Sequence, residues 1–344
     1  MKKTVYAGNM AIGGGNPVSV QSMTNTKTRN IEATSAQILS LAEAGCDIVR
    51  IAVQNEEDCK AFSKLPKPVP LVADIQYDLK NAVYALENGA DKIRINPQNS
   101  SDTLLKKVCD CANAHNAPIR IGINYGSVRE ELKNRYSPPE ALVKAAVEAA
   151  EKTEKAGCDN LVLSVKSSDV AVTVKSYRML DSLSPYPLHL GVTEAGDLLS
   201  SAIKSSAALG TLLMDGIGDT IRYSITGDPL KEAEAALTLL KALGLRRGME
   251  IIACPTCSRT TVNLEKLLSD VKSALSFLKD KPVKVAVMGC AVNGIGEAKD
   301  ADFGVAASNG KGVIFADGKQ LKIVDESKIV SELAELGRLY TGKK

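Results

Sequence analysis

The sequence predicts an α/β protein with an N-terminal TIM (β/α)8 barrel and a smaller C-terminal α/β domain. The length of 344 residues fits a barrel of ~250 residues plus a second domain of about 100. A loose repeat also runs through residues 30–226, where an Ala-rich amphipathic helix ends at a glycine and a β-branched run follows. We expect the boundary near Gly248, which gives domains 1–248 and 249–344.

The repeat is clearest where a helix stop leads into a strand. Gly45, Gly89 and Gly157 each follow a helical pattern and precede an apolar run. Strands are expected at residues 18–23, 48–53, 70–75, 92–96, 118–123, 160–165, 187–192 and 220–225. Continuous apolar strands that alternate with helices indicate a parallel sheet covered on both faces. Eight such units favour a closed barrel over an open doubly wound sheet, because no Gly-x-Gly-x-x-Gly follows the first strand.

The second domain shows a mixed pattern. Its expected elements are a helix at 262–279, strands at 283–288, 312–316 and 320–324, and a final helix from about 326. The glycine-rich stretch 304–312 is similar to a phosphate-binding loop, but its glycine spacing is one residue too long. Gly312 also replaces the Ser or Thr that would hold magnesium, so we expect a turn.

Charge and composition exclude several classes of partner. The net charge is +3 and no basic run is present, so we expect no nucleic acid partner. No stretch reaches the ~18 apolar residues of a membrane span, so we expect no membrane partner. The upstream cysteines lack disulfide spacing, which fits a reducing, cytoplasmic location; they are Cys46, Cys59, Cys109, Cys111 and Cys158.

Two cysteine loops lie near the C-terminal end of the chain. Cys254 and Cys257 form a C-x-x-C pair after one apolar run, and Cys290 lies in a glycine-rich loop after another. Both histidines lie far upstream, so a fourth ligand would be an oxygen, with Glu297 the nearest candidate, or an external molecule. Three thiolates and one weak position suit a 4Fe-4S cluster with one reactive iron. The alternative is a pair of buried cysteines plus an unrelated third.

Basic residues interrupt several apolar strands of the predicted barrel. An unpaired charge in such a strand costs several kcal/mol, so each basic residue needs an anionic partner. The residues are Arg50, Arg94, Arg120, Lys166 and Arg222. Internal ion pairs with Asp74, Asp78 or Glu194 are one explanation, but three acids cannot neutralise five bases. Convergence at the catalytic face of a barrel indicates a polyanionic ligand, most simply a diphosphate, with polar residues such as Asn124 and Ser224 completing its binding site.

Several motifs in order give the chain a resemblance to a known family. They are Val20–Thr26, Arg94–Pro97, Arg120–Ser127, Thr193–Gly196, Gly216–Thr220 and both cysteine loops. The chain resembles the (E)-4-hydroxy-3-methylbut-2-enyl diphosphate synthases of the non-mevalonate isoprenoid pathway, in their two-domain bacterial form, over essentially its whole length. Three positions depart from the family pattern: Gln76 stands in place of His, Gln98 of Gly and Ile295 of Pro.

The resemblance implies an activity and an assembly. The barrel would bind 2-C-methyl-D-erythritol 2,4-cyclodiphosphate, and a cluster domain would cover the barrel of the partner subunit in a homodimer. Flavodoxin or ferredoxin would supply two electrons for a reductive dehydroxylation. Glu297 would be a displaceable cluster ligand, Glu194 a proton donor and Asn293 a positioning residue. Plainer roles are a salt bridge for Glu194 and a loop position tolerant of positive φ for Asn293.

Two other function classes fit parts of the sequence. One is a phosphate-binding barrel transferase, similar to pterin synthases, with a structural zinc domain. The other is an electron carrier without enzymatic activity. Zinc is colourless, so an absorption spectrum separates the first from an iron–sulfur enzyme. A carrier has no use for five basic residues at strand ends.

Overall fold

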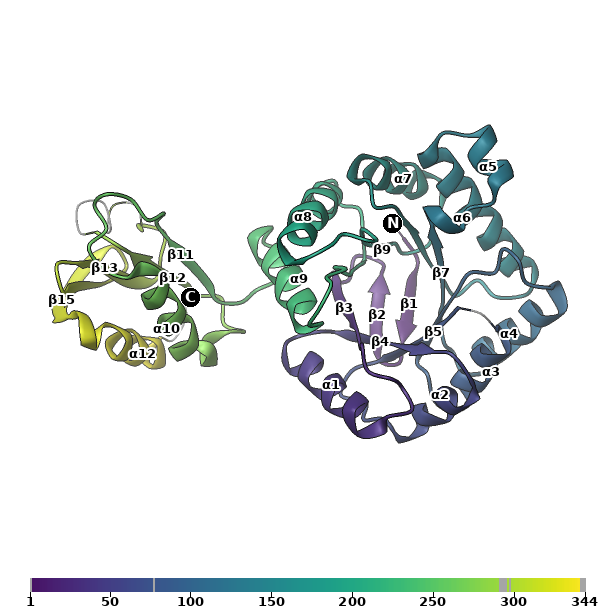
Figure 1. The fold of residues 1–344 in the computed structure, drawn as a ribbon, viewed down its shortest axis with the longest axis horizontal. Coiled ribbons are helices and arrows are strands. Elements are labelled where there is room, and N and C mark those ends of the chain that lie inside the picture. The colour runs from purple at the N-terminus through teal and green to yellow at the C-terminus, as the bar shows by residue number, and fades with distance from the viewer. Residues whose placement is uncertain (1, 77, 291–295, 297, 341–344) are drawn as a thin grey trace. The chain divides into compact units, whose positions relative to one another are not determined.

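The computed structural model describes residues 2–76, 78–290, 296 and 298–340. The chain divides into two compact units, Met1–Leu245 and Arg246–Lys344 (Figure 1). The division lies a few residues before the expected boundary at Gly248. Within the described part of the chain, no helix is long and apolar enough to cross a membrane.

The first unit is a closed parallel barrel, which confirms the predicted fold class. Its strands are β3 (Ser19–Met23), β4 (Ile48–Val53), β5 (Leu71–Ile75), β6 (Lys92–Ile95), β7 (Ile119–Asn124), β8 (Leu161–Lys166), β9 (His189–Leu190) and β10 (Thr220–Ile221). They pair in the order β8-β7-β6-β5-β4-β3-β10-β9. A parallel bridge between Leu163 and Leu188 joins the two ends of this order and closes the ring.

Helices surround the barrel, as Figure 1 shows. They are α1 (Ile31–Glu43), α2 (Glu56–Ala61), α3 (Lys80–Glu87), α4 (Asp102–Ala114), α5 (Glu130–Arg135), α6 (Pro138–Lys155), α7 (Val170–Leu183), α8 (Leu198–Met214) and α9 (Leu230–Ala242), with short 3-10 turns at Phe62–Lys64 and Tyr125–Ser127. Gly45, Gly89 and Gly157 have φ of 100°, 97° and 96°, so the expected glycine helix stops are present.

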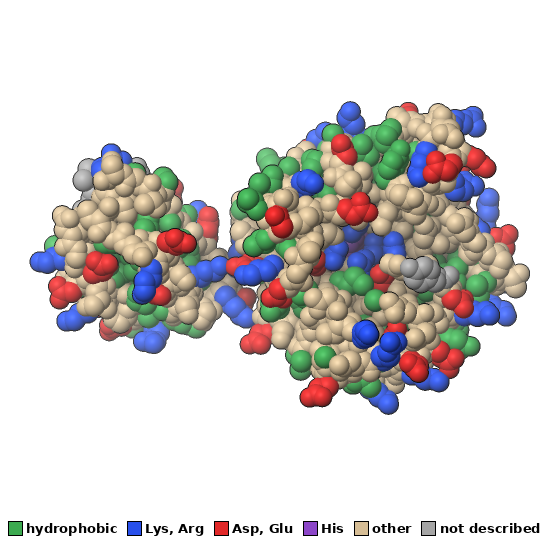
Figure 2. All heavy atoms as spheres, viewed as in Figure 1, with side chains coloured by type: hydrophobic (Ala, Val, Ile, Leu, Met, Phe, Trp, Pro, Cys, Tyr) green, Lys and Arg blue, Asp and Glu red, His purple; other side chains and the backbone are tan. Residues whose placement is uncertain are grey.

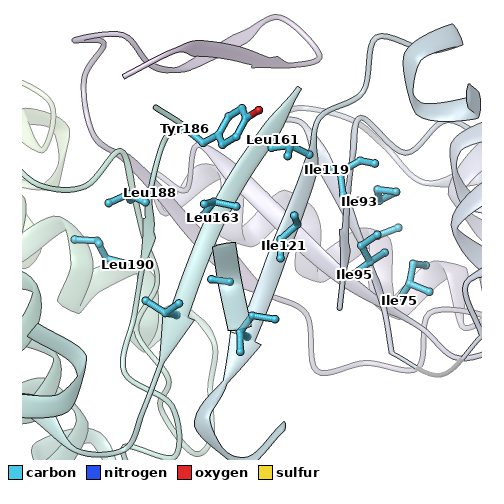
Figure 3. Packing of buried hydrophobic residues seen from close by; sticks show 14 of the residues in the cluster. Ile75, Ile93, Ile95, Ile119, Ile121, Leu161, Leu163, Tyr186, Leu188 and Leu190 are labelled. Carbon is cyan, nitrogen blue, oxygen red and sulfur yellow. The ribbon is translucent and has the colours of Figure 1, made fainter. Parts of the chain in front are cut away.

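The strands present alternate residues to the helices and to the barrel interior. Ile93, Ile95, Ile119 and Ile121 belong to the core cluster between strands and helices, and Figure 3 shows them with their neighbours on β8 and β9. Since successive side chains of a strand point to opposite faces, the residues between them point inward. The basic residues of β6 and β7 are therefore inside the barrel.

An N-terminal hairpin closes the opposite end of the barrel from the expected ligand face. It consists of β1 (Thr4–Ala7) and β2 (Met10–Gly13), paired antiparallel. Val5, Ala7 and Ile12 pack against Ile48, Val72 and Val162, which lie at the N-terminal ends of their strands. The sequence analysis did not predict this hairpin, which forms an apolar floor beneath the barrel interior.

The second unit is a five-stranded mixed sheet with helices. Its elements are β11 (Glu250–Ala253), α10 (Leu264–Ala274), a 3-10 turn at Ser276–Leu278, β12 (Lys284–Met288), β13 (Phe303–Ser308), β14 (Lys311–Ala316), β15 (Lys319–Asp325), a 3-10 turn at Glu326–Lys328 and α12 (Ile329–Leu339). β11, β12 and β13 are parallel, and the other pairs are antiparallel. The stretch 304–312 is largely strand β13 with a hairpin turn at Asn309–Gly310, so the expectation of a turn throughout was wrong.

Candidate active site

The five basic residues singled out in the sequence lie on five different barrel strands or directly after them. Arg50, Arg120 and Lys166 are 9%, 1% and 6% exposed, and Arg94 and Arg222 are half-buried. Figure 2 shows Lys and Arg side chains gathered in the hollow at the centre of the barrel. The interior of this barrel is therefore strongly cationic, whereas branched apolar side chains usually fill such interiors.

Asp74 is the acidic centre of one part of this cluster. Its Oδ1 accepts a hydrogen bond from Nη1 of Arg94 at 3.3 Å, and its Oδ2 lies 3.9 Å from Nε of Arg50. Burial acts to raise the pKa of the Asp74 carboxyl, but Arg50, Arg94 and Arg120 together hold that pKa below its ordinary value. Asp74 is thus a carboxylate at neutral pH that two arginines share.

Arg222 has a partner of its own, which the sequence analysis missed. Its Nη2 donates to Oε1 of Glu232 at 2.8 Å, and its Nε donates to Oε2 at 3.2 Å. Glu232 lies in the first turn of α9 and is 2% exposed. Arg222 also bonds the hydroxyl of Ser224, a predicted ligand-binding residue. Burial lowers the pKa of Arg222 to about 10, with Glu232 opposing the shift, so the guanidinium stays protonated at neutral pH.

Arg120 and Lys166 are the two basic residues of this set that have no ion-pair partner among the described residues. Arg120 donates from Nη1 to Ser164 Oγ at 2.9 Å, while its Nε and Nη2 have no acceptor among the described residues. No carboxylate in the described ranges lies within ion-pair distance of either side chain. Burial, reinforced by Arg120, Arg50 and other guanidiniums, lowers the pKa of Lys166 well below its ordinary value. An anion bound beside them would stabilise the protonated forms of both side chains.

Two glycines make room for the basic side chains. A Cβ at Gly122 would lie 2.5 Å from Nε of Arg94, and one at Gly191 would lie 2.6 Å from Nζ of Lys166. Neither glycine has a positive φ, so backbone conformation does not require glycine at these positions. Glycine is required because a larger residue would collide with the basic side chain. The Gly122 carbonyl in addition accepts a hydrogen bond from Arg94 Nη2 at 3.1 Å. The backbone is therefore shaped around these cations.

The loops at the C-terminal ends of the strands bring the other predicted residues to the barrel mouth. Asn124 at the end of β7 is in register with Lys166 at the end of β8, and its side chain is half-buried. Glu194, after β9, is exposed and has a φ of 54°. A non-glycine residue in this left-handed region is uncommon and often marks a functional loop. Asp78, weighed as an ion-pair partner, instead accepts a hydrogen bond from the Lys80 backbone at 2.9 Å.

The cysteine loops lie at the ends of two adjacent parallel strands. Ala253 of β11 is in register with Val287 of β12, so Cys254 and Cys290 follow neighbouring strands at the same edge. The Gly289 amide donates to Cys254 Sγ at 3.2 Å, which places the two loops in contact. Cys257 is exposed, and a backbone hydrogen bond from Arg259, supported by Thr260, lowers the pKa of its thiol. A lowered pKa favours the thiolate, which is the form that binds metals.

The three cysteines are of the donor type that holds a thiolate-bound metal group, but the structure does not bring Cys254, Cys257 and Cys290 together around one point. Among the described residues no three Cys, His, Asp or Glu side chains converge closely enough to hold one metal ion. Both histidines lie in the barrel unit, where His189 is fully buried. The predicted residues Asn293 and Glu297 lie outside the described residues. The cysteines alone thus supply soft ligands, as an iron–sulfur group requires.

Three other residues of the barrel interior were not predicted from the sequence. Met23 Sδ accepts hydrogen bonds from Nε and Nη2 of Arg50 at 3.1 and 3.0 Å. Lys92 and His189 are fully buried inside the barrel. The inward direction of Lys92 could have been predicted from strand alternation, since Lys92 lies two residues before Arg94. The position of Glu232 could not, because it depends on how α9 packs against the barrel.

A parallel barrel with a cationic interior, together with a small unit whose two cysteine loops follow neighbouring strands, defines a two-domain α/β protein. Comparison with known sequences then gives the family. The chain belongs to the GcpE family, because the model of the GcpE TIM-barrel domain matches residues 2–237 and that of the GcpE protein C-terminal domain matches residues 250–338.

Curated relatives match the chain over nearly its whole length. A protein of Caldicellulosiruptor saccharolyticus is 49% identical over 346 residues, 99% of each chain. One of Caldanaerobacter subterraneus subsp. tengcongensis is 48% identical over 339 residues, 97% of this chain and 95% of the relative. Both are named 4-hydroxy-3-methylbut-2-en-1-yl diphosphate synthase (flavodoxin).

Solved structures resemble the barrel. Dihydropteroate synthase from Stenotrophomonas maltophilia aligns with a TM-score of 0.52 at 17% identity, covering 70% of this chain and 98% of that one. The enzyme from Xanthomonas albilineans with 4-aminobenzoic acid aligns with a TM-score of 0.51 at 17% identity, covering 71% and 99%. At this identity the likeness shows the fold alone.

Proposed function

We propose that this chain catalyses the reductive dehydroxylation and ring opening of 2-C-methyl-D-erythritol 2,4-cyclodiphosphate to (E)-4-hydroxy-3-methylbut-2-enyl diphosphate, a step of isoprenoid biosynthesis. The observation that carries the proposal is the cationic barrel interior in a chain of the GcpE family, where five basic residues face two buried carboxylates, Asp74 and Glu232. A cyclic diphosphate supplies the missing negative charge. The relatives' names supply the product and the flavodoxin donor.

The barrel residues bind the diphosphate. Arg120 and Lys166 are almost fully buried and lack carboxylate partners in the described part of the chain, so they would hold its phosphate oxygens. Arg50 and Arg94 are oriented by Asp74, and Arg222 by Glu232. Asn124 and Ser224 would complete the binding site from the mouth. Guanidinium groups fixed in this way bind phosphate with little loss of side-chain entropy.

The second unit holds a 4Fe-4S cluster through Cys254, Cys257, Cys290 and Glu297. When bound, the cluster supplies the two electrons of the reduction, which it receives from flavodoxin or ferredoxin. In the overall reaction the ring C–O bond breaks and the phosphate oxygen keeps the electron pair. The hydroxyl on the neighbouring carbon leaves as water after it gains one proton.

Residues of the chain handle this proton and orient the hydroxyl. Glu194 lies in the exposed loop after β9 and would donate the proton to the departing oxygen. Its φ of 54° is the uncommon left-handed conformation that often occurs in functional loops. Asn293 would position the hydroxyl. The reaction needs neither a nucleic acid nor a membrane, and a cytoplasmic location fits the free thiols of this chain.

The active enzyme is a homodimer in which the cluster unit of one chain covers the barrel mouth of the other. An apolar stripe on α8 offers a further contact between barrels, because Leu199, Ile203 and Met214 are 70%, 61% and 78% exposed. Figure 2 shows hydrophobic side chains on the surface in the region of α8. Large exposed apolar patches commonly mark protein interfaces.

Mixing two impaired variants at a low substrate concentration tests the dimer. Arg120→Ala weakens substrate binding by the barrel, and Cys290→Ala damages the cluster unit. Unfolding and refolding the two together would form mixed dimers with one intact barrel facing one intact cluster unit, so activity would return. If the mixture stays impaired, each barrel works with the cluster unit of its own chain.

Anaerobic turnover tests the proposed activity. Protein reconstituted with iron and sulfide is supplied with reduced flavodoxin and the cyclic diphosphate, and the linear product is followed by phosphorus NMR. Conversion is expected, together with a brown colour and about four iron and four sulfide per chain. Zinc without iron in the reconstituted protein, or no conversion with the cluster present, would refute the proposal.

Replacing Glu297 tests the exchangeable ligand. A carboxylate binds iron less tightly than a thiolate, so a substrate oxygen can compete with it. Glu297→Cys should keep the cluster absorption while it suppresses turnover, and Glu297→Gln should lower turnover and make the cluster more sensitive to oxygen. Turnover by Glu297→Cys at the parent rate, with the cluster present, would contradict this role.

A further inference from the structure

Below the arginines, the barrel interior contains a second set of polar side chains. Lys92 and His189 are fully buried, and Gln21 is 1% exposed. Lys92 Nζ, both ring nitrogens of His189 and both side-chain polar atoms of Gln21 make no hydrogen bond within the described part of the chain. Buried polar groups without partners are rare, so this layer calls for a physical explanation.

The position of Lys92 follows from the strand register. Lys92 lies beside Val72 of β5, and two residues later Arg94 lies beside Asp74. Val72 packs on the apolar floor made by the N-terminal hairpin. Because side chains alternate along a strand, Lys92 points inward between this floor and the arginines. It is thus one layer deeper than the residues proposed to touch the ligand.

The groups around Lys92 offer little negative charge. The charged or titratable side chains on the inward face of the neighbouring elements are Arg50 on β4, Asp74 on β5, Arg94 on β6, Arg120 on β7, Lys166 on β8, His189 on β9 and Arg222 after β10, with Glu232 reaching Arg222 from α9. Asp74 is shared by Arg50 and Arg94, and Glu232 pairs with Arg222. The hairpin residues that form the floor are apolar.

An ammonium ion in such surroundings is unfavourable. Burial, with Arg120 as the second cause, lowers the pKa of Lys92 to about 7. In the free protein a substantial share of the Lys92 side chains therefore carries a neutral amine above neutral pH. A dianion bound at the arginines would reverse this balance, because negative charge nearby favours the protonated form.

We propose that Lys92 is a proton-accepting positioning residue for the diphosphate: its amine takes a proton from solvent when the ligand binds, and the resulting ammonium supports the bound charge from below. The ligand in this inference rests on the proposed function. The lone pair of Nζ forms the new N–H bond, solvent buffer supplies the proton, and no oxidation or reduction is involved. Above neutral pH, the Lys92 side chain is therefore a neutral amine in the free protein and an ammonium ion in the complex.

The cyclic diphosphate itself neither takes up nor releases protons in the pH range of the experiment. A phosphate monoester has a second pKa near 6, but each phosphorus of a cyclic diphosphate carries a single, strongly acidic hydroxyl. Its charge therefore stays constant between about pH 6 and 9. Protons taken up on binding in this range belong to the protein.

Titration calorimetry in buffers of different ionisation enthalpy counts these protons. The cluster-containing protein is titrated with the cyclic diphosphate at pH 8 without reductant, so no turnover occurs. We expect the wild type to take up protons, and Lys92→Met to take up fewer by roughly one proton. Gln21→Met is the matched control, because it alters another buried, unpartnered side chain of the layer without removing a titrating group. It should keep the wild-type proton count.

The pH dependence of affinity gives a second readout. Binding that takes up a proton weakens as pH rises, so wild-type affinity should fall from pH 7 to 9 more steeply than that of Lys92→Met. Equal proton uptake by wild type and Lys92→Met would overturn the proposal. If Lys92→Met does not fold, Lys92→Gln replaces it, and wild-type uptake that is no larger at pH 8 than at pH 6 also overturns it. Absence of any binding by the wild type would instead refute the proposed function.

Discussion

The two faces of the barrel strands differ sharply. On β6, Ile93 and Ile95 face the helices and are fully buried in the main core cluster, while Lys92 and Arg94 face the interior. β7 repeats the pattern, with Ile119 and Ile121 outside and Arg120 inside. The same strands thus combine a stabilising apolar face with a face whose buried charges oppose folding. The difference indicates that the interior is shaped for a ligand.

The outer face should give the largest effect on stability. Ile121→Ala removes buried methyl groups from the core and should cost about 2 to 5 kcal/mol, whereas Ile121→Val should cost about 0.5 to 1.5 kcal/mol. Denaturant unfolding of the isolated variants measures both values. Affinity of the folded variants for the cyclic diphosphate should stay close to wild type. A large loss of affinity without loss of stability would contradict the division between the faces.

An inner-face charge should matter mainly for binding. Arg120→Ala removes a guanidinium and should weaken binding of the cyclic diphosphate by about 1.5 to 3 kcal/mol, or roughly tenfold to a hundredfold. Calorimetry measures the change, and cluster absorption should be unaltered. Arg178→Ala is a control, since Arg178 forms an exposed pair with Asp215 at 2.8 Å. Unchanged affinity of Arg120→Ala would remove this residue from the site.

The space around the charges provides a finer test. Gly122→Ala places a methyl group against Arg94 and should weaken binding by roughly tenfold, since overpacking typically costs about 1 to 3 kcal/mol. Gly126→Ala is the matched control, because nothing lies within 4 Å of a Cβ there and its φ is not in the left-handed region. Equal affinity of the two variants would show that Arg94 can move without loss.

Exposed charges should contribute least. Lys106 and Asp110 on α4 form an i,i+4 pair at 2.9 Å with both side chains exposed. Lys106→Ala should change stability by less than about 0.5 kcal/mol, with the effect reduced further by salt. Denaturant unfolding at two salt concentrations checks this. A larger effect would mean that interior and surface charges differ less than we infer.

Much of the barrel could be predicted because its strands are continuous apolar runs. All eight strands and the inserted arginines were visible, since alternation places Arg94 and Arg120 opposite to their isoleucine neighbours. The hairpin Thr4–Gly13 was missed because its two strands have only four residues each, too few for a periodic pattern to be recognised. Strand β13 was missed because the glycines of the stretch 304–312, Gly304 in β13, Gly310 in the turn and Gly312 in β14, are typical of a loop.

The pairing of the interior charges could be predicted only in part. Asp74 follows from its place in β5, but Glu232 reaches Arg222 through the packing of α9, which no local pattern reveals. The floor below Lys92 depends on the hairpin, so its burial was hidden as well. Asn293 and Glu297 lie outside the described residues, and their roles stay predictions.

The melting midpoint of Lys166→Met with and without the cyclic diphosphate tests the central claim most directly. Lys166 is 6% exposed, and methionine has nearly the same length without the charge. Without ligand, the variant should melt at or above the wild-type midpoint, because a buried amine without an ion-pair partner, whose protonation is unfavourable, has been removed. Ligand at 100 times its Kd should stabilise the wild type by about 2.7 kcal/mol and the variant much less. A variant that melts lower than the wild type and gains equally from the ligand would contradict the account.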